Sequence, residues 1–166
     1  ELAYTYLNLG DLNLNLNNFN KSNDYYMKSW TIFKNTTEEK ISKMSQEELI
    51  KKINTDEDFE IEIYRFTNLF NSLAINSAKT YDFKLSHEYL DIYLYYLNLK
   101  NDKDLNNNNI LNSSLSYYHF NKARLYLAEG KLKSAELNFL ESLSYGKKTK
   151  DYPNLLSFKT YLNLFN

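Results

Sequence analysis

Three stretches of the sequence place small residues at matching distances from a central turn. The turns are NNF at residues 17–19, YDF at 81–83 and GKL at 130–132. The aligned small positions are Gly10, Ser22 and Ser29 in the first stretch, Ala74 and Ser86 in the second, and Ala123, Ala135 and Ser142 in the third. Small side chains let two antiparallel helices approach closely, while larger neighbours fill the gaps beside the crossing. The pattern therefore predicts repeated helix-turn-helix units.

Larger residues also coincide in this alignment. The aligned large positions are Leu14 and Leu127, Phe19 and Leu132, and Tyr26, Leu90 and Phe139. The middle stretch departs at one place, where Tyr93 occupies a position that is small in the other two. The pentapeptide TYLNL occurs at residues 5–9 and again at 160–164. Its Tyr and Leu residues fit the packing face of a unit's first helix, so a partial unit is expected from residue 158.

Composition favours helices along the whole chain. The 166 residues include three Gly, one Pro and no Val, whereas Leu and Lys are abundant. Val favours strands, and Leu and Lys propagate helices well. With 43 % hydrophobic and 25 % charged residues, the chain has the composition of a folded protein. We therefore predict an all-α fold, and the many Asn, Lys, Tyr and Ile residues indicate only an AT-rich genome.

The repeated pattern resembles the tetratricopeptide repeat, a helix-turn-helix unit with small residues at three fixed positions. The resemblance covers residues 3–34, 67–99 and 116–148, followed by a terminal helix at 152–165. The units are divergent, because they begin farther apart than the roughly 34 residues typical of the family. The resemblance implies an all-α, right-handed solenoid of antiparallel helix pairs, with about seven to eight helices in one domain over residues 1–166. Because the chain begins at Glu1 rather than Met, we expect a fragment of a longer protein.

The segments between the units also have helical signals. Ser45 and Glu48 form a capping-box pattern at the start of a short helix. A long helix is expected from near Thr55, with an acidic first turn that suits the helix dipole. Its predicted buried stripe is Phe59, Ile63, Phe66, Phe70, Leu73 and Ser77. Residues 100–109 are the most loop-like, and a further helix is expected from 110 until Gly130 ends it.

Charge and residue content argue against several classes of function. The net charge is −1 with mixed signs along the chain, so we expect no nucleic-acid partner. Cysteine is absent, which excludes disulfides, thiolate nucleophiles and cysteine metal ligands and fits a cytoplasmic location. No apolar run reaches the roughly 20 residues that a membrane span requires. We expect no cofactor.

Catalytic and metal-binding signals are weak. The two histidines, His87 and His119, lie in different units without accompanying motifs, so structural roles are expected and the chain is not interpreted as an enzyme. The acidic run at residues 56–62 has the alternate spacing of a calcium loop. However, Ile61 stands where that loop needs Gly and Thr67 where it needs Glu. A helix start is the better interpretation, and no metal site is expected.

The family resemblance implies that the first helix of each unit lines a concave, partner-binding face. Transferred by position, this face consists of Tyr4, Asn8, Asp11, Asn68, Asn71, Ser72, Tyr117, Asn121 and Arg124. Amide side chains can pair with both polar groups of a peptide backbone, and tyrosines provide broad contact area. The resemblance therefore implies a protein- or peptide-binding scaffold. The alternative is that these asparagines reflect genome bias and only hydrate the surface.

Three further interpretations remain open from the sequence. The chain is similar to the peptide-sensing domain of bacterial regulators whose long, divergent repeats follow a DNA-binding helix-turn-helix. A helical enzyme rests only on the two histidines. Self-association is a third hypothesis, because the last helix carries an apolar stripe that a homodimer or a cap could cover. That stripe consists of Leu155, Leu156, Tyr161, Leu162 and Phe165.

Overall fold

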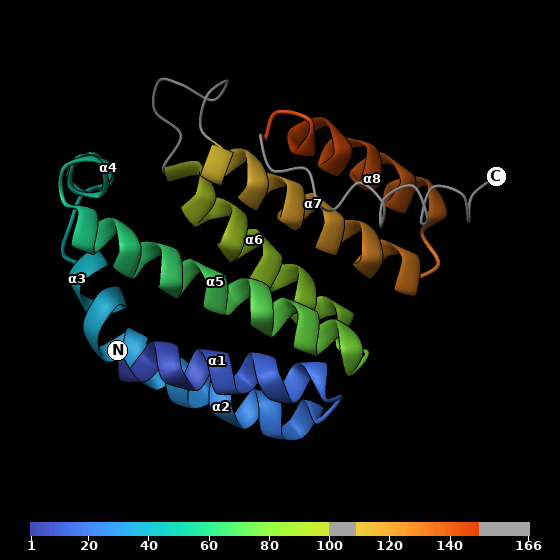
Figure 1. Cartoon of the computed structure of the whole chain (residues 1–166), viewed down its shortest axis with the longest axis horizontal. Coiled ribbons are helices and arrows are strands. Elements are labelled where there is room, and N and C mark those ends of the chain that lie inside the picture. The colour runs from blue at the N-terminus through green and yellow to red at the C-terminus, as the bar shows by residue number, and fades with distance from the viewer. Residues whose placement is uncertain (100–108, 150–166) are drawn as a thin grey trace. The chain divides into compact units, whose positions relative to one another are not determined.

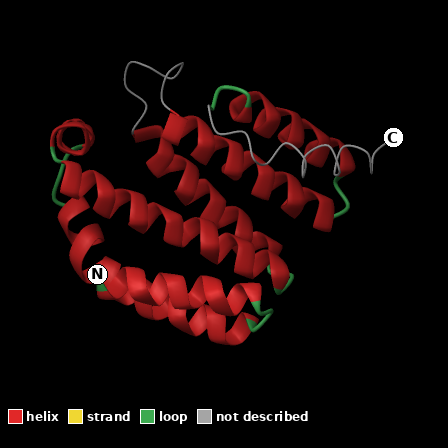
Figure 2. Ribbon diagram, in the orientation of Figure 1, coloured by secondary structure: helices red, strands yellow, loops and turns green. Residues whose placement is uncertain are grey.

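The computed structural model describes residues 1–99 and 109–149, and it confirms the all-α prediction. Within these ranges no residue belongs to a strand, and short loops join the helices (Figure 2). The elements are α1 (Leu2–Asn15), α2 (Phe19–Phe33), the π-helical turn η1 (Lys34–Glu38), α3 (Glu39–Ile41), α4 (Gln46–Thr55), α5 (Glu57–Lys79), α6 (Phe83–Leu99), α7 (Asn109–Ala128) and α8 (Leu132–Gly146). The terminal helix expected at 152–165, and all of the expected loop except Asn109, lie outside the described residues.

The helices form two compact units, and the division falls within α6. The first unit, Glu1–Tyr96, contains α1 to α5 and most of α6, and Figure 1 shows α1 and α2 lying along each other. The second unit begins at Leu97 and contains the end of α6 together with α7 and α8. Two of the three aligned stretches therefore belong to the first unit and one to the second.

All three aligned turns have the same backbone structure. Each contains one residue in the left-handed region, namely Asn17 (φ 58°), Tyr81 (φ 64°) and Gly130 (φ 76°). The next residue donates its N–H to a carbonyl five residues earlier. These bonds join Asn18 to Asn13 (2.8 Å), Asp82 to Ser77 (2.9 Å) and Lys131 to Tyr126 (2.8 Å). Such a bond is the mark of a Schellman turn, which satisfies carbonyls at the end of a helix. The alignment thus identified one recurring turn despite three different residues at its centre.

The aligned small residues are buried where paired helices meet. Gly10, Ser22 and Ser29, and their counterparts in the other two stretches, all have little solvent exposure. Three of the serines also bond across their helix pairs, and in the second stretch Ser86 Oγ donates to the carbonyl of Ala74 at 2.8 Å. Ser29 Oγ donates to the carbonyl of Ala3 at 2.8 Å, and Ser142 Oγ donates to the equivalent carbonyl, that of Ser116. Not every aligned large residue fills the interior, because Leu132 at the start of α8 is 55 % exposed.

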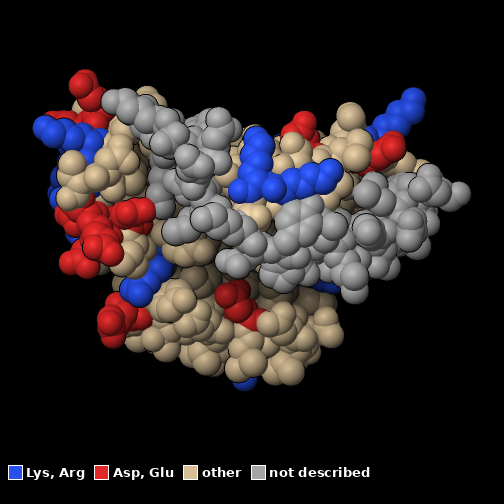
Figure 3. Space-filling model, turned by 45° about the horizontal axis from the view of Figure 1, so that its top comes forward, with Lys and Arg blue, Asp and Glu red and all other residues tan. Residues whose placement is uncertain are grey.

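Helix α5 forms the centre of the first unit. Its predicted apolar stripe is buried throughout, and the helix contacts α1, α2 and α4. It begins at Glu57, close to the expected start near Thr55, and the Asp56 side chain caps it by accepting the backbone N–H of Phe59 at 3.0 Å. The acidic run therefore starts a helix, as expected. Figure 3 shows acidic side chains gathered at the end of the first unit that carries α4, whose first turn contributes Glu47 and Glu48.

The capping box predicted for α4 is confirmed. Glu48 N–H donates to Ser45 Oγ at 3.2 Å, and Ser45 N–H donates to Glu48 Oε2 at 2.7 Å. These reciprocal bonds satisfy two backbone donors that the first turn of a helix leaves unpaired. Local sequence signals therefore stabilise α4, which lies between the first and second aligned stretches. Helix α4 also packs on α5.

Candidate functional site

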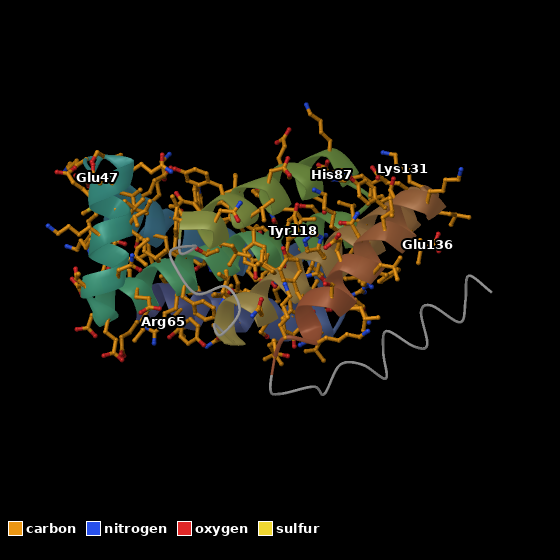
Figure 4. The ribbon with its side chains drawn as sticks, turned by 90° about the horizontal axis from the view of Figure 1, so that it is seen from above. Glu47, Arg65, His87, Tyr118, Lys131 and Glu136 are labelled. Carbon is orange, nitrogen blue, oxygen red and sulfur yellow. The ribbon has the colours of Figure 1, made fainter. Side chains whose placement is uncertain are left out.

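The predicted concave-face residues of the first unit join α1, α2 and α5. Asp11 Oδ1 accepts hydrogen bonds from Tyr26 Oη at 2.7 Å and from Ser72 Oγ at 2.8 Å. Arg65 projects from α5 (Figure 4), and its guanidinium carbon lies 4.6 Å from the centre of the Tyr4 ring. Burial, reinforced by the neighbouring Asp11 charge, raises the pKa of Tyr26 well above its usual value. Asp11 and Ser72 therefore serve internal packing in this structure.

The other predicted face residues have different degrees of exposure. On the first unit Asn8 is exposed, whereas Asn68 and Asn71 are half-buried. On the second unit Tyr117 is 48 % exposed, and Asn121 and Arg124 are half-buried. The Arg124 guanidinium lies 5.7 Å from the ring centre of Phe120, one turn earlier on α7. The structure thus joins Asp11 to Ser72, places Tyr4 beneath Arg65, and leaves Tyr117, Asn121 and Arg124 on a separate unit.

The two histidines occupy packing positions. His119 on α7 stacks on Tyr145 with ring centres 5.4 Å apart, and its Nδ1 lies 3.2 Å from Asn138 Oδ1. Burial lowers the pKa of His119, although the bond to Asn138 opposes this shift. His87 lies on α6, next to the buried Ser86, and is half-buried (Figure 4). His119 therefore makes packing contacts with Tyr145 and Asn138, whereas the structural role expected of His87 stays a prediction.

An open groove in the first unit is a stronger candidate for ligand binding. It has a volume of about 380 Å³ and lies between α2, η1, α5 and α6. Its lining combines five aromatic rings with Ile92 and two acidic residues. The rings are those of Trp30, Phe66, Phe70, Tyr95 and Tyr96, and the acidic residues are Glu38 and Asp91. We name this feature the aromatic groove.

The rings of the aromatic groove hold one another in place. Trp30 stacks on Phe66 with centres 6.0 Å apart and an interplanar angle of 11°, and it meets Phe70 edge-on at 5.3 Å. Tyr96 meets Phe66 edge-on at 5.2 Å, and Tyr95 meets Tyr96 at 5.2 Å. Offset-stacked and edge-to-face pairs are the favourable arrangements for aromatic rings. The network gives the groove rigid walls, while Tyr95 remains 52 % exposed at its mouth.

The π-helical turn brings Glu38 to the groove. In η1, Thr36 Oγ1 donates to the carbonyl of Ile32 at 2.9 Å, the kind of local bond that widens or bends a helix. The buried Thr37 donates to Glu62 Oε1 on α5 at 2.6 Å, and Lys40 donates to Glu62 Oε2 at 2.9 Å. Glu62 thereby fixes η1 on α5. Single π-helical turns occur frequently at functional sites.

The electrostatics of the groove are dominated by acidic groups. Glu38 Oε2 is buried, and it accepts no hydrogen bond from any residue that the structure describes. Burial, followed by the negative charge of Glu38, raises the pKa of Tyr96 to about 12. The phenol of Tyr96 is therefore neutral near pH 7. An apolar groove that contains a buried, unpartnered carboxylate oxygen is chemically suited to a cation with N–H donors.

The aromatic groove was not predicted from the sequence, because its lining residues come from several helices. Phe66 and Phe70 were predicted to be buried, but Trp30, Tyr95 and Tyr96 belong to other helices. Helical periodicity indicates which residues face inward on one element, and it does not show which elements leave space between them. The clustering of aromatic residues near the ends of α2 and α6 was the available signal. The π-helical turn that positions Glu38 had no recognised signature.

Comparisons with known proteins give no match. No family model, no curated protein and no solved structure matches the chain. Among residues 1–99 and 109–149, no group of acidic, histidine or cysteine residues could hold a metal ion. Within the same ranges, every helix is too short or too polar to cross a membrane. The groove and the helix pairs are therefore the features of this chain that bear on its function.

Proposed function

We propose that this protein is a protein- or peptide-binding scaffold built as a tetratricopeptide-like solenoid of antiparallel helix pairs. The aromatic groove is the observation that supports this function best. It is open, lined mainly by aromatic rings, and carries polar groups at few points, as recognition sites commonly do. The recurring Schellman turns and the buried small residues support the repeat architecture. Such scaffolds bind their partners on the surfaces of stacked helix pairs.

The proposed binding surface is the groove rather than the α1 and α5 face suggested by family resemblance. Asp11 and Ser72 on that face bond to each other, and Arg65 lies over one face of the Tyr4 ring. A peptide would have to displace these contacts before it could bind there. In the groove, by contrast, Tyr95 and Trp30 already border an open volume. The α1 and α5 face is the second candidate surface.

Selection from a randomised twelve-residue peptide display library tests this function. The full chain is immobilised, and enrichment is compared between the wild type and three variants. Tyr95→Ala alters the groove, Asn8→Arg alters the α1 and α5 face, and Tyr64→Ala truncates an exposed tyrosine of α5 that does not line the groove. We expect sequence-related peptides to be enriched on the wild type, Asn8→Arg and Tyr64→Ala, and lost on Tyr95→Ala. If no peptide family is enriched on the wild type, the proposed function is wrong.

A further inference from the structure

We propose that the aromatic groove binds an arginine side chain of the partner peptide, an inference that depends on the peptide-binding function proposed above. Every charged residue that lines the groove is acidic, and five aromatic rings surround the same volume. This combination of carboxylates and aromatic faces is the chemistry that attracts organic cations. The peptide would insert its guanidinium between α2 and α6 and leave its backbone at the surface.

Glu38 is the first reason to expect a cationic ligand in the aromatic groove. Its Oε2 atom is buried and has no hydrogen-bond donor among the residues that the structure describes. A buried carboxylate oxygen without a donor is unfavourable, because the desolvation cost is not offset. Lys40, two residues further along the chain, is paired with Glu62 at 2.9 Å. A donor supplied by a bound peptide would satisfy Glu38 and offset this cost.

The aromatic rings provide a second, independent argument. Elsewhere in the chain, lysine and arginine side chains cover the faces of several rings, including Arg65 over Tyr4 at 4.6 Å and Lys28 over Tyr25 at 5.3 Å. No described lysine or arginine lies over a ring of the aromatic groove. One face of Trp30 stacks on Phe66, but no lysine or arginine of the described residues occupies the Trp30 and Tyr95 rings, which leaves them to a cation from another molecule. Tryptophan is the most favourable partner for such a cation.

Arginine fits this groove better than lysine. Its planar guanidinium can stack on an aromatic face while its N–H groups point at a carboxylate. It is also more weakly hydrated than an ammonium group, so less solvation is lost on entry into an apolar volume. The groove offers both an aromatic face and a carboxylate, since Trp30 and Glu38 line the same volume. A long aliphatic stem would pack against Ile92 and the Phe70 ring.

Trp30 supplies a direct readout, because it is the only tryptophan in the chain. A peptide enriched in the display selection is synthesised with its arginine unchanged, replaced by citrulline, or replaced by lysine. Citrulline keeps the shape of arginine and removes its charge. Titration is followed by tryptophan fluorescence. We expect the arginine peptide to shift the emission and saturate, and the citrulline peptide to bind at least about tenfold more weakly, as loss of a charged hydrogen bond implies. The lysine peptide should be intermediate.

A matched pair of variants completes the test. Glu38→Gln removes the groove carboxylate and should weaken binding of the arginine peptide by about tenfold or more. Glu39→Gln makes the same change at the next residue, which is exposed and paired with Lys43, and should leave the affinity within about twofold. Circular dichroism confirms that both variants stay folded. If enriched peptides lack arginine, or bind equally with citrulline or to Glu38→Gln, the arginine inference is wrong while the peptide-binding function stands.

Discussion

The contact between Gly10 and Tyr26 sets how closely α1 and α2 can approach each other. A Cβ atom placed on Gly10 would lie 2.2 Å from Cε1 of Tyr26, well inside van der Waals contact. The equivalent positions in the other two stretches hold Ala74 and Ala123, and the residues aligned with Tyr26 there are the buried Leu90 and Phe139. The three helix pairs thus fill the equivalent crossing with side chains of different sizes. Interiors packed at crystal density leave no spare space for an added methyl group.

Gly10→Ala should destabilise the protein by about 1–3 kcal/mol, because the added methyl group forces the buried Tyr26 ring to move. Urea unfolding monitored by circular dichroism measures this change. The same substitution in a Tyr26→Leu background should cost less, because leucine leaves room for the methyl group. Equal costs in the two backgrounds would show that the ring contact does not determine the requirement for glycine.

His119 should make stability depend on pH in the mildly acidic range. Burial lowers its pKa in the folded state, so the unfolded chain binds the proton more readily. The free energy of unfolding should therefore be unaffected by this group above the unfolded pKa of about 6.5, and it should decrease as the pH falls below that value. Urea unfolding between pH 7.5 and 5 measures the decrease. His119→Gln should reduce the slope, and a slope identical to that of the wild type would contradict the assignment.

At the scale of helices and turns, the three Schellman turns place unlike residues in one backbone conformation. Gly130 adopts φ 76° without steric cost, whereas Tyr81 adopts φ 64° and is 80 % exposed. A left-handed conformation costs a residue with a Cβ about 1–2 kcal/mol relative to glycine. The turn of the second stretch is therefore strained, while that of the third is not.

Opposite substitutions at these equivalent positions should have opposite effects. Tyr81→Gly should raise the free energy of unfolding by about 0.5–1 kcal/mol, after allowance for the greater freedom of glycine in the unfolded chain. Gly130→Ala should lower it by about 1 kcal/mol. Thermal and urea unfolding of both variants measure these changes. A destabilised Tyr81→Gly would mean that the contact between the Tyr81 and Phe83 rings, 6.1 Å apart, outweighs the backbone strain.

The helices were predictable because their signals are local. The capping box of Ser45 and Glu48, the acidic start of α5 and the recurring small residues each indicate structure within a few turns of the chain. The groove was not predictable in this way. It requires the π-helical turn after α2, which places Glu38 beside rings from α5 and α6. Spaces between helices depend on how whole elements pack, and a pattern along one helix does not encode them.

At the scale of the whole molecule, the repeated helix pairs and the aromatic groove are distributed differently between the two compact units. Helix pairs joined by Schellman turns occur in both compact units. The groove residues all lie between Trp30 and Tyr96, within the first unit. Ligand binding at the groove should therefore stabilise α2, α5 and α6 most. Helix α8, which pairs with α7 in the second unit, contributes no residue to the groove.

Hydrogen exchange of the full chain, with and without a saturating arginine-bearing peptide, tests this distribution. A ligand that binds only the folded state stabilises the elements it contacts against local opening. We expect slower exchange in Phe19–Phe33 and Glu57–Lys79, and little change in Leu132–Gly146. Glu38→Gln at the same peptide concentration should show much weaker protection. Equal protection of α8 would place the binding surface beyond the first unit and contradict a site confined to the groove.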